Sequence, residues 1–395
     1  MLSISTARTI ASVVVVGTIV VGGLIARRWR RSEQSPQPGA SPINEIENPL
    51  LERGRQSLED IKEWITQSPK IELHCHLNGS VRSSTLQELI PSESAMHVGI
   101  VHSIEDAFSV FKDVYQAIST ELHLRRIVRE CLEDAFSDHV CYLELRTTPR
   151  KLSDVHNRRD YVKVVVDEIS KFQNLNEQRP FTSFPRDKLA VRLILTIDRG
   201  QPVSVADQTV DIALRFSDWV VGIDFAGNPT IGSFGDFYSV FMRATGHGLC
   251  TTIHTSEVRG VETETDAILD FKPNRIGHFL FPTDSQIAKV IEGGIAIESC
   301  PTSNICAITG MSPLDGDMTD HSILDRFVRT HQELITINTD DPGVFNVRLS
   351  DELHSVARSF ELNLPEVKRM LLAPARHAFL SKSEKEALVS SLAIE

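Results

Sequence analysis

Short apolar runs and longer amphipathic segments alternate along the chain from about residue 70 onward. Apolar side chains recur at helical spacing in the segments 104–119, 159–173 and 205–219, which predicts amphipathic helices there. The short runs between such segments are rich in Val, Ile and Leu, which predicts strands. These predicted strands span residues 71–77, 140–145, 190–197, 219–225, 249–254, 275–280, 294–299 and 334–338.

The order of these elements indicates an α/β fold. The predicted strands show little alternation of apolar and polar positions, as expected for a parallel sheet that is buried on both faces. Successive strand–helix units predict a single (β/α)8 TIM barrel with extra helices. A doubly wound open sheet is the structural alternative, but no G-x-G-x-x-G motif follows the first strand.

The N-terminal segment has a different pattern. Residues 10–26 carry no charge, and the basic cluster RRWRR follows them at residues 27–31. A run of this length is near the lower limit for a membrane-spanning helix, and the positive-inside rule places the residues after it in the cytoplasm. We therefore expect residues 1–31 to form a hydrophobic membrane-anchor or targeting segment, and the rest of the chain to face the cytosol.

Three alternatives remain open for this segment. A cleaved secretory signal normally carries its charge before the apolar run, where only Arg8 lies in this chain. A mitochondrial presequence agrees with the absence of acidic residues before Glu33, although the apolar run is too continuous for an amphipathic helix. A soluble cytosolic protein is the third alternative.

Residues 32–50 are polar and contain four prolines, which predicts a disordered linker before a barrel domain at residues 51–395. The formal net charge of -12 argues against a nucleic-acid partner, because such binding depends on neutralising phosphates. It does not exclude a small anionic ligand, which needs only a few local donors. The six cysteines are scattered and are predicted to be reduced thiols. We expect a monomer.

Polar residues follow all of the predicted strands. The carboxyl ends of barrel strands meet at one face, where barrel enzymes keep their active sites, so these residues are candidates for catalysis. In chain order they are His74, His76 and Asn78; RTTPR at 146–150; Asp198; Gly227; HTSE at 254–257; His278; CPTSN at 300–304; and Asp340 with Asp341.

The histidines at these strand ends suggest a metal site. His74 and His76 are two residues apart, so in a strand their side chains point to the same side. A lone H-x-H pair is weak evidence, but His254 and the paired carboxylates of the last strand can reach the same barrel axis. Three imidazoles and one carboxylate suit a divalent ion such as zinc. A catalytic zinc activates water, and His278 and Asp341 are available to orient and deprotonate it.

Glu257 lies three residues after His254, on the loop that leaves the same strand. It is therefore near the metal site without needing to bind the ion. This position suits a carboxylic acid that is held protonated in a partly buried site and donates its proton to the substrate. A solvated loop glutamate is the alternative.

Several of these motifs together resemble one family. PKIELHCHLNGS, GIDFAGNP, HTSE, RIGH, CPTSN and NTDDPGVF are similar to the motifs of the adenosine/AMP deaminase family of zinc hydrolases, in the same order. The resemblance runs from about residue 69 to about residue 360. It implies hydrolytic replacement of the purine six-position amine by oxygen, with one zinc ion per subunit. The zinc ligands that it implies are His74, His76, His254 and Asp340.

The resemblance also implies roles for other residues. Glu257 would donate a proton to the purine ring nitrogen, and His278 and Asp341 would handle the attacking hydroxide. Gly227 would offer a backbone contact to the base. The residues implied to contact the substrate are His76, Asn78, Tyr115, Thr147, Thr148, Pro149, Arg150, Asp198, Gly227, His254 and Asp341.

Asn78 bears on the substrate class. Adenosine deaminases typically carry an acidic residue at this position, in an HLDG motif, where the carboxylate faces the ribose five-prime hydroxyl. A 5′-phosphate would meet a like charge there, whereas an amide removes the repulsion and supplies donors. HLNGS, ELRTTPR and IDRG resemble the adenosine deaminase-like subgroup, which acts on N6-methyl-AMP and related nucleotides.

Other residues also concern the binding of such a nucleotide. Thr147, Thr148 and Arg150 offer hydroxyl and cationic donors for a phosphate. One position departs from the subgroup, because Tyr115 stands where its IHQ motif has a histidine. A phenol can hydrogen-bond but carries no charge at neutral pH, so the contact that this histidine makes with the sugar or phosphate is expected to differ here.

The leading hypothesis is a zinc-dependent deaminase that converts N6-methyl-AMP to IMP and methylamine. The enzymatic alternative is an adenosine deaminase that releases inosine and ammonia, and Asn78 is the residue that discriminates between the two. The remote alternative is a catalytically dead, membrane-tethered purine-binding protein. It is disfavoured because every expected metal and acid–base position is filled.

Overall fold

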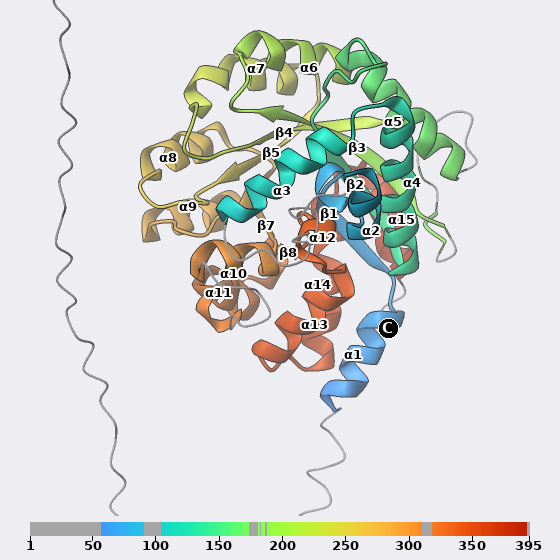
Figure 1. Ribbon diagram of the computed structural model, residues 1–395. Helices are drawn as coiled ribbons and strands as arrows, with labels where there is room; N and C mark the ends of the chain where they lie inside the picture. Colours follow the sequence, from blue (N-terminus) through green and yellow to red (C-terminus); the bar gives the residue numbers. More distant parts are fainter. Residues whose placement is uncertain are drawn as a thin grey trace, which may run out of the picture. The chain divides into compact units, whose positions relative to one another are not determined.

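In the computed structural model of the chain, eight parallel strands form one sheet in which each strand pairs with the next along the chain (Figure 1). β8 returns to β1 through a parallel bridge between Cys75 and Asp340, which nearly closes the sheet into the predicted (β/α)8 barrel. The strands are β1 (Lys70–His76), β2 (Val140–Thr147), β3 (Ala190–Asp198), β4 (Val220–Ala226), β5 (Cys250–Thr255), β6 (Arg275–His278), β7 (Ala296–Ser299) and β8 (Ile335–Ile337).

Helices connect the strands and surround the sheet. The outer ring consists of α4 (Glu121–Ser137), α5 (Arg158–Gln173), α6 (Val203–Arg215), α7 (Phe234–Gly246), α8 (Glu262–Phe271), α9 (Asp284–Gly293), α11 (Ser322–Thr330) and α14 (Leu364–His377). The additional helices are α1 (Leu58–Gln67), α2 (Ser83–Leu89), α3 (Ile104–Ala117), α10 (Pro301–Thr309), α12 (Pro342–Phe345), α13 (Leu349–Ser359) and α15 (Lys382–Leu392). Short 3-10 turns are η2 (Asn78–Ser80), η4 (Met318–Asp320) and η5 (Gln332–Leu334).

The structure describes residues 57–90, 104–173, 181, 183–185, 188–309 and 318–392. The predicted anchor segment at residues 1–31 and the predicted linker at residues 32–50 lie outside these residues. In the described part of the chain, none of the helices has the length and apolar character that crossing a bilayer requires.

Side chains complete the barrel where the short strand β8 meets β1. The Asn338 Oδ1 accepts a hydrogen bond from the Leu73 backbone N–H at 3.1 Å, and the Glu72 Oε2 accepts one from the Thr339 N–H at 3.0 Å. Beyond them, the Asp340 backbone pairs with β1 on both sides of Cys75. This pairing fixes the residue after β8 beside the end of β1.

The barrel interior holds ion pairs as well as apolar side chains. Arg146 and Arg275 are fully buried, and each reaches a carboxylate oxygen of Glu298. Arg275 also pairs with Glu144, which is likewise fully buried. Buried charges are tolerated when they are paired. Both arginines are paired, although the Nε and Nη1 of Arg146 have no hydrogen-bond partner among the described residues. The apolar core lies mainly between the sheet and the surrounding helices.

All of the predicted strands form, but some of their ends differ from the expectation. Gly294 is not part of β7, because it adopts a left-handed conformation with φ 61° and ends α9. β6 ends at His278 rather than at residue 280, because His278 and Phe279 both have positive φ angles, 63° and 56°. The turn in the backbone at these two residues directs the chain away from the sheet.

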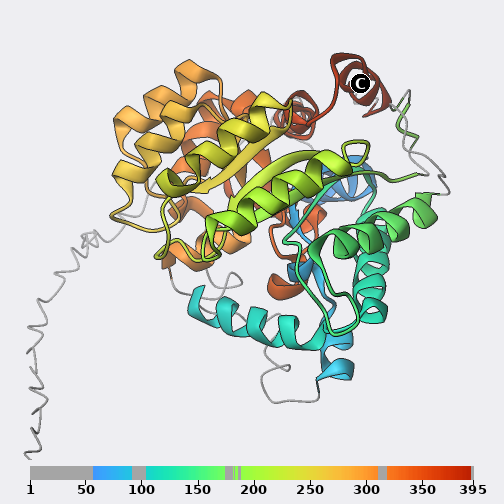
Figure 2. The same cartoon turned by 90° about the horizontal axis from the view of Figure 1, so that it is seen from above.

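α3 lies over one end of the barrel, apart from the helices of the outer ring (Figures 1 and 2). It corresponds to the helix expected at residues 104–119 and ends two residues earlier, at Ala117. Phe111 and Tyr115 on this helix line the cavity described below.

Candidate active site

A cavity of about 470 Å³ opens at the carboxyl ends of the strands. Its lining includes most of the residues that the sequence singled out as functional. These are His76, Asn78, Tyr115, Thr147, Thr148, Asp198, Gly227, His254, Glu257, His278, Asp340 and Asp341. Two predicted substrate contacts lie elsewhere, because Pro149 and Arg150 line a neighbouring cavity of about 250 Å³. The two cavities share Tyr115, Thr148 and Asp198 among their lining residues.

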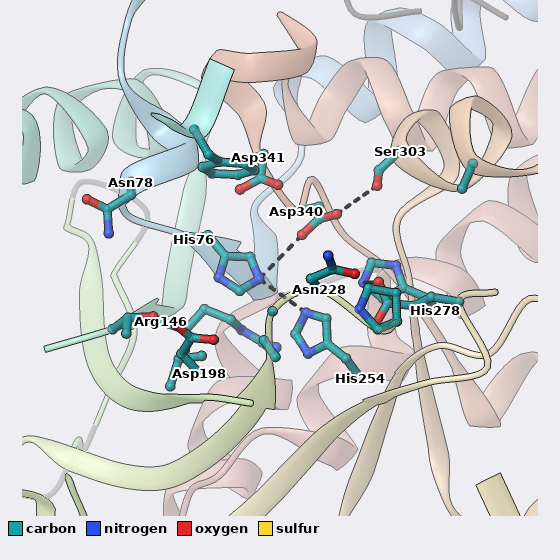
Figure 3. Close-up of a pocket in the computed structure, with 18 of the residues that line it drawn as sticks. His76, Asn78, Arg146, Asp198, Asn228, His254, His278, Ser303, Asp340 and Asp341 are labelled. Atoms are coloured by element: carbon teal, nitrogen blue, oxygen red, sulfur yellow. Dashed lines mark hydrogen bonds and ion pairs between the residues drawn. The ribbon is translucent and has the colours of Figure 1, made fainter. Parts of the chain in front are cut away.

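Imidazole and carboxylate groups from four strand ends converge at the floor of the larger cavity (Figure 3). The Nε2 atoms of His76 and His254 are 3.2 Å apart. The Asp340 Oδ1 lies 3.2 Å from the His74 Nε2 and 3.4 Å from the His76 Nε2. His278 belongs to the same cluster, since ligand-capable atoms of His74, His254, His278 and Asp340 all lie within 4.8 Å of one another.

The remaining ring nitrogens of this cluster are held by acidic or amide side chains. The His74 Nδ1 lies 2.8 Å from the Glu298 Oε2, and the His254 Nδ1 lies 2.9 Å from the Asp224 Oδ1. The His278 Nδ1 lies 2.9 Å from the Asn304 side-chain amide. A carboxylate that accepts the Nδ1–H leaves the Nε2 lone pair free to bind a metal ion.

The cluster fits a divalent metal ion. Four ligands in a tetrahedron around zinc, each about 2.0 Å from the ion, would lie about 3.3 Å from one another. The observed separations of 3.2 to 3.4 Å between the Nε2 atoms and the Asp340 Oδ1 agree with that spacing. The buried His74 Nε2 has no hydrogen-bond partner among the described residues, as expected for an atom that faces an ion. A buried group of histidines and aspartate can therefore hold a metal here.

The adjacent carboxyls of Asp340 and Asp341 have opposite pKa shifts and therefore favour different protonation states. Burial alone would raise both pKa values, but His278 and His74 hold the pKa of Asp340 well below its usual range. The pKa of Asp341 is well above its usual range because of burial and the negative charge of Asp340. Asp340 is therefore suited to contact a cation, and Asp341 favours the neutral acid.

Glu257 and His278 lie beside each other at the cavity wall. The Glu257 Oε2 is 3.9 Å from the His278 Nε2, and the Glu257 side chain is partly buried with 19% of its surface exposed. Burial lowers the pKa of His278 despite the nearby Glu257 carboxylate. At neutral pH the His278 imidazole is therefore neutral and able to accept a proton.

Asn78 lies across the cavity from His278 and Ser303, on the same side as Arg146 and Asp198 (Figure 3). Asn78 is buried, and its Oδ1 has no hydrogen-bond partner in the described part of the chain. Burial raises the pKa of Tyr115 to about 12, so its phenol carries no charge at neutral pH.

Two groups that orient the cluster were not predicted from the sequence: Glu298 and Asp224. Asn304 and Ser303 belong to the CPTSN motif among the sequence candidates, and the Ser303 Oγ donates a hydrogen bond to the Asp340 Oδ2 at 2.7 Å. The available signal for Glu298 and Asp224 was an acidic residue inside an otherwise apolar strand. Such a residue must be paired, because an unpaired buried charge is costly.

Comparison with known proteins agrees with this geometry. Residues 69–394 match the family model described as adenosine deaminase. An Arabidopsis thaliana protein named N6-mAMP deaminase is 34% identical over 350 residues, which cover 82% of this chain and 96% of that protein. A Danio rerio protein named N6-methyl-AMP deaminase is 33% identical over 318 residues, which cover 75% of this chain and 86% of that protein.

Solved structures of Arabidopsis proteins are also similar to this chain. The crystal structure of the Arabidopsis N6-mAMP deaminase matches with a TM-score of 0.75 and 34% identity, covering 84% of this chain and 99% of that one. A structure described as Arabidopsis ADAL complexed with IMP matches with a TM-score of 0.74 and 34% identity. It covers 84% of this chain and 97% of that one.

Proposed function

This chain belongs to the adenosine deaminase family, and from that membership we propose that it is a metal-dependent hydrolase that converts N6-methyl-AMP and water to IMP and methylamine. The observation that carries the proposal is the cavity at the strand ends, where a cluster of histidines and Asp340 lies beside Glu257 and His278. The substrate is inferred from the relatives named N6-methyl-AMP deaminase and from the uncharged side chain of Asn78 in the cavity wall.

We assign the metal site to one zinc ion, which residues from three strand ends would hold. When bound, zinc supplies Lewis-acid activation of water. The nitrogen-rich ligand set favours zinc over magnesium or calcium, which prefer oxygen ligands. The proposed ligands are His74, His76, His254 and Asp340.

Different residues of the chain then carry out the individual proton transfers. Glu257 donates a proton to the purine ring nitrogen, which makes the six-position carbon more electrophilic. His278 accepts a proton from the attacking water, and its lowered pKa keeps it neutral for that role. Asp341 orients the water from the other side, and Gly227 offers its backbone to the base. Methylamine then leaves with a proton from the site.

The opposite end of the cavity is proposed to receive the ribose and the 5′-phosphate. Asn78, Thr147 and Thr148 provide uncharged polar groups at that end. A carboxylate in place of Asn78 would repel a phosphate in a site that excludes most water, and an amide does not. Arg150 lies in the neighbouring cavity, so its positive charge would act on the phosphate from behind Tyr115 and Thr148.

The test is a side-by-side assay of N6-methyl-AMP, AMP, N6-methyladenosine and adenosine with the full chain and measured zinc content. We expect N6-methyl-AMP to have the highest kcat/KM, and chelation of the metal to abolish turnover. Turnover of adenosine alone would replace this proposal with an adenosine deaminase. Folded protein with neither bound metal nor turnover would indicate a purine-binding protein without activity.

A further inference from the structure

A fully buried tyrosine stands behind the cavity wall at the Asn78 end. Tyr161, on α5, has no exposed surface, and its hydroxyl lies 2.9 Å from the Thr147 Oγ1 at the end of β2. Tyr161 does not line the larger cavity, whereas Thr147 does. The tyrosine can therefore influence a substrate only through the residues that it holds.

The Tyr161 hydroxyl interacts with more than Thr147. Burial raises the pKa of this hydroxyl, and the positive charge of nearby Arg150, together with the polar side chains of Thr147 and Asn78, acts in the opposite direction. These partners come from different segments, the end of β2, the turn after β1 and the loop before α5.

Arg150 extends this arrangement to the helix over the barrel end. Its guanidinium donates to the backbone carbonyl oxygens of Tyr115 at 3.3 Å and Ile118 at 2.6 Å. It also lies 4.9 Å from the centre of the Tyr115 ring. Tyr161 is therefore connected, through Arg150, to the end of α3 that lines both cavities.

We propose that Tyr161 is a positioning residue that sets the preference for a nucleotide over a nucleoside, because its hydroxyl fixes Asn78, Thr147 and Arg150 relative to one another. This inference rests on the proposed function, in which the Asn78 end of the cavity receives the 5′-phosphate. The purine end, with His278, lies on the other side of the cavity from Asn78 and does not depend on this hydroxyl (Figure 3).

The physical reason is orientation. Without the hydroxyl, the Thr147 side chain loses the hydrogen bond that orients it, and the buried Asn78 amide loses a polar neighbour. Each side chain then samples orientations that do not favour the phosphate, and misplacement of polar groups lowers affinity for the part of the substrate that they contact. A nucleoside lacks that part and is affected less.

The test compares Tyr161→Phe with Tyr142→Phe in the full chain. Tyr142 is a matched control, because it is also fully buried and its hydroxyl donates to one side chain, Glu144, away from the cavity. The kinetic constants kcat and KM are measured for N6-methyl-AMP and N6-methyladenosine, and Kd is measured for IMP and inosine.

We expect Tyr161→Phe to lower the nucleotide-to-nucleoside ratio of kcat/KM about tenfold, mainly through a higher KM for the nucleotide. The IMP-to-inosine affinity ratio should fall by a similar factor. Tyr142→Phe should leave both ratios unchanged, with a comparable shift in Tm.

Equal losses for both substrates, or unchanged ratios in Tyr161→Phe, would overturn the inference. If Tyr161→Phe does not fold, Thr147→Val breaks the same hydrogen bond from the strand side, and an unchanged ratio there has the same meaning. The proposed function is tested separately, since it fails only if the wild-type chain prefers the nucleoside or shows no turnover.

Discussion

At the scale of single residues, the absence of a side chain at Gly79 has a specific structural reason. A Cβ atom at this position would overlap the Asp341 carboxylate, which lies directly against the Gly79 backbone. Asp341 is buried, and its Oδ1 has no hydrogen-bond partner among the described residues. The glycine of HLNGS therefore leaves the space in which Asp341 reaches the cavity.

Replacement of Gly79 by alanine is expected to displace Asp341 and lower kcat about 100-fold, the scale of a lost acid–base or orienting group. Gly246→Ala is the control, because a Cβ at Gly246, at the end of α7, meets nothing within 4 Å. Steady-state kinetics and Tm are measured for both variants. Wild-type activity in a folded Gly79→Ala protein would remove Asp341 from the proposed mechanism.

Glu298 is a second residue whose effect is exerted through its neighbours. Its Oε2 accepts hydrogen bonds from both the His74 Nδ1 and the Arg146 Nη2, and its Oε1 pairs with Arg275. It therefore fixes the tautomer of one proposed ligand and neutralises two buried cations.

Glu298→Gln is expected to weaken metal binding about 10- to 100-fold, because the amide no longer supplies the charge that holds His74. Glu352→Gln is the control, since Glu352 is also a buried glutamate and, among the described residues, its hydrogen bonds come from Thr302. Zinc content after dialysis against a graded chelator measures the effect. Equal zinc retention in the two variants would contradict the role of Glu298.

At the scale of secondary-structure elements, a single carboxyl joins two helices beneath the site. Glu352 on α13 accepts hydrogen bonds from the Thr302 N–H in the first turn of α10, at 3.2 Å to each oxygen. Burial raises the pKa of Glu352 to about 8, and the negative charges of Glu72 and Asp351 act in the same direction. The hydrogen bonds from Thr302 oppose the shift.

This pKa predicts a pH dependence of stability. The folded-state pKa lies above the unfolded value of 4.5, so the contribution of Glu352 is full below pH 4.5 and is lost as the pH rises toward 8. A shift of this size corresponds to on the order of 5 kcal/mol as an upper limit. Denaturant unfolding from pH 5 to pH 9 should show Glu352→Gln gaining stability relative to wild type as the pH rises. A constant difference between the two proteins would show that Glu352 stays ionised.

For the whole molecule, the N-terminal segment is predicted to determine location and not chemistry. The cavity and all of its lining residues lie between residues 76 and 345, and the family match begins at residue 69. We propose that residues 10–26 anchor the chain and that the catalytic part faces the cytosol. The apolar run and the basic cluster after it support this orientation.

Deletion of residues 1–31 is therefore expected to move a C-terminally tagged protein from the membrane fraction to the soluble fraction, with kcat/KM unchanged. Fractionation and fluorescence microscopy measure the location, and protease treatment of intact vesicles reports which side the tag faces. A full-length protein that is soluble, or that carries the tag inside mitochondria, would favour one of the alternative interpretations of this segment.

The fold was largely predictable because its signals are local. Strands buried on both faces are short runs rich in Val, Ile and Leu, and amphipathic helices repeat their apolar positions at helical spacing. The exact strand ends were less predictable. The turn at His278 and Phe279 depends on left-handed backbone conformations that are rare for such residues, so no local preference signals them.

The sequence by itself determined the strand–helix order, the candidate residues at the strand ends and the family resemblance, because each depends on residue types at fixed spacing. Only the tertiary structure decided which of these groups meet. It brought Asp340 against His74 and His76 through the bridge that joins β8 to β1, and it placed Arg150 in a second cavity. It also revealed Glu298 and Tyr161 as partners, since barrel closure, and not local residue spacing, decides which groups of distant strands and helices meet.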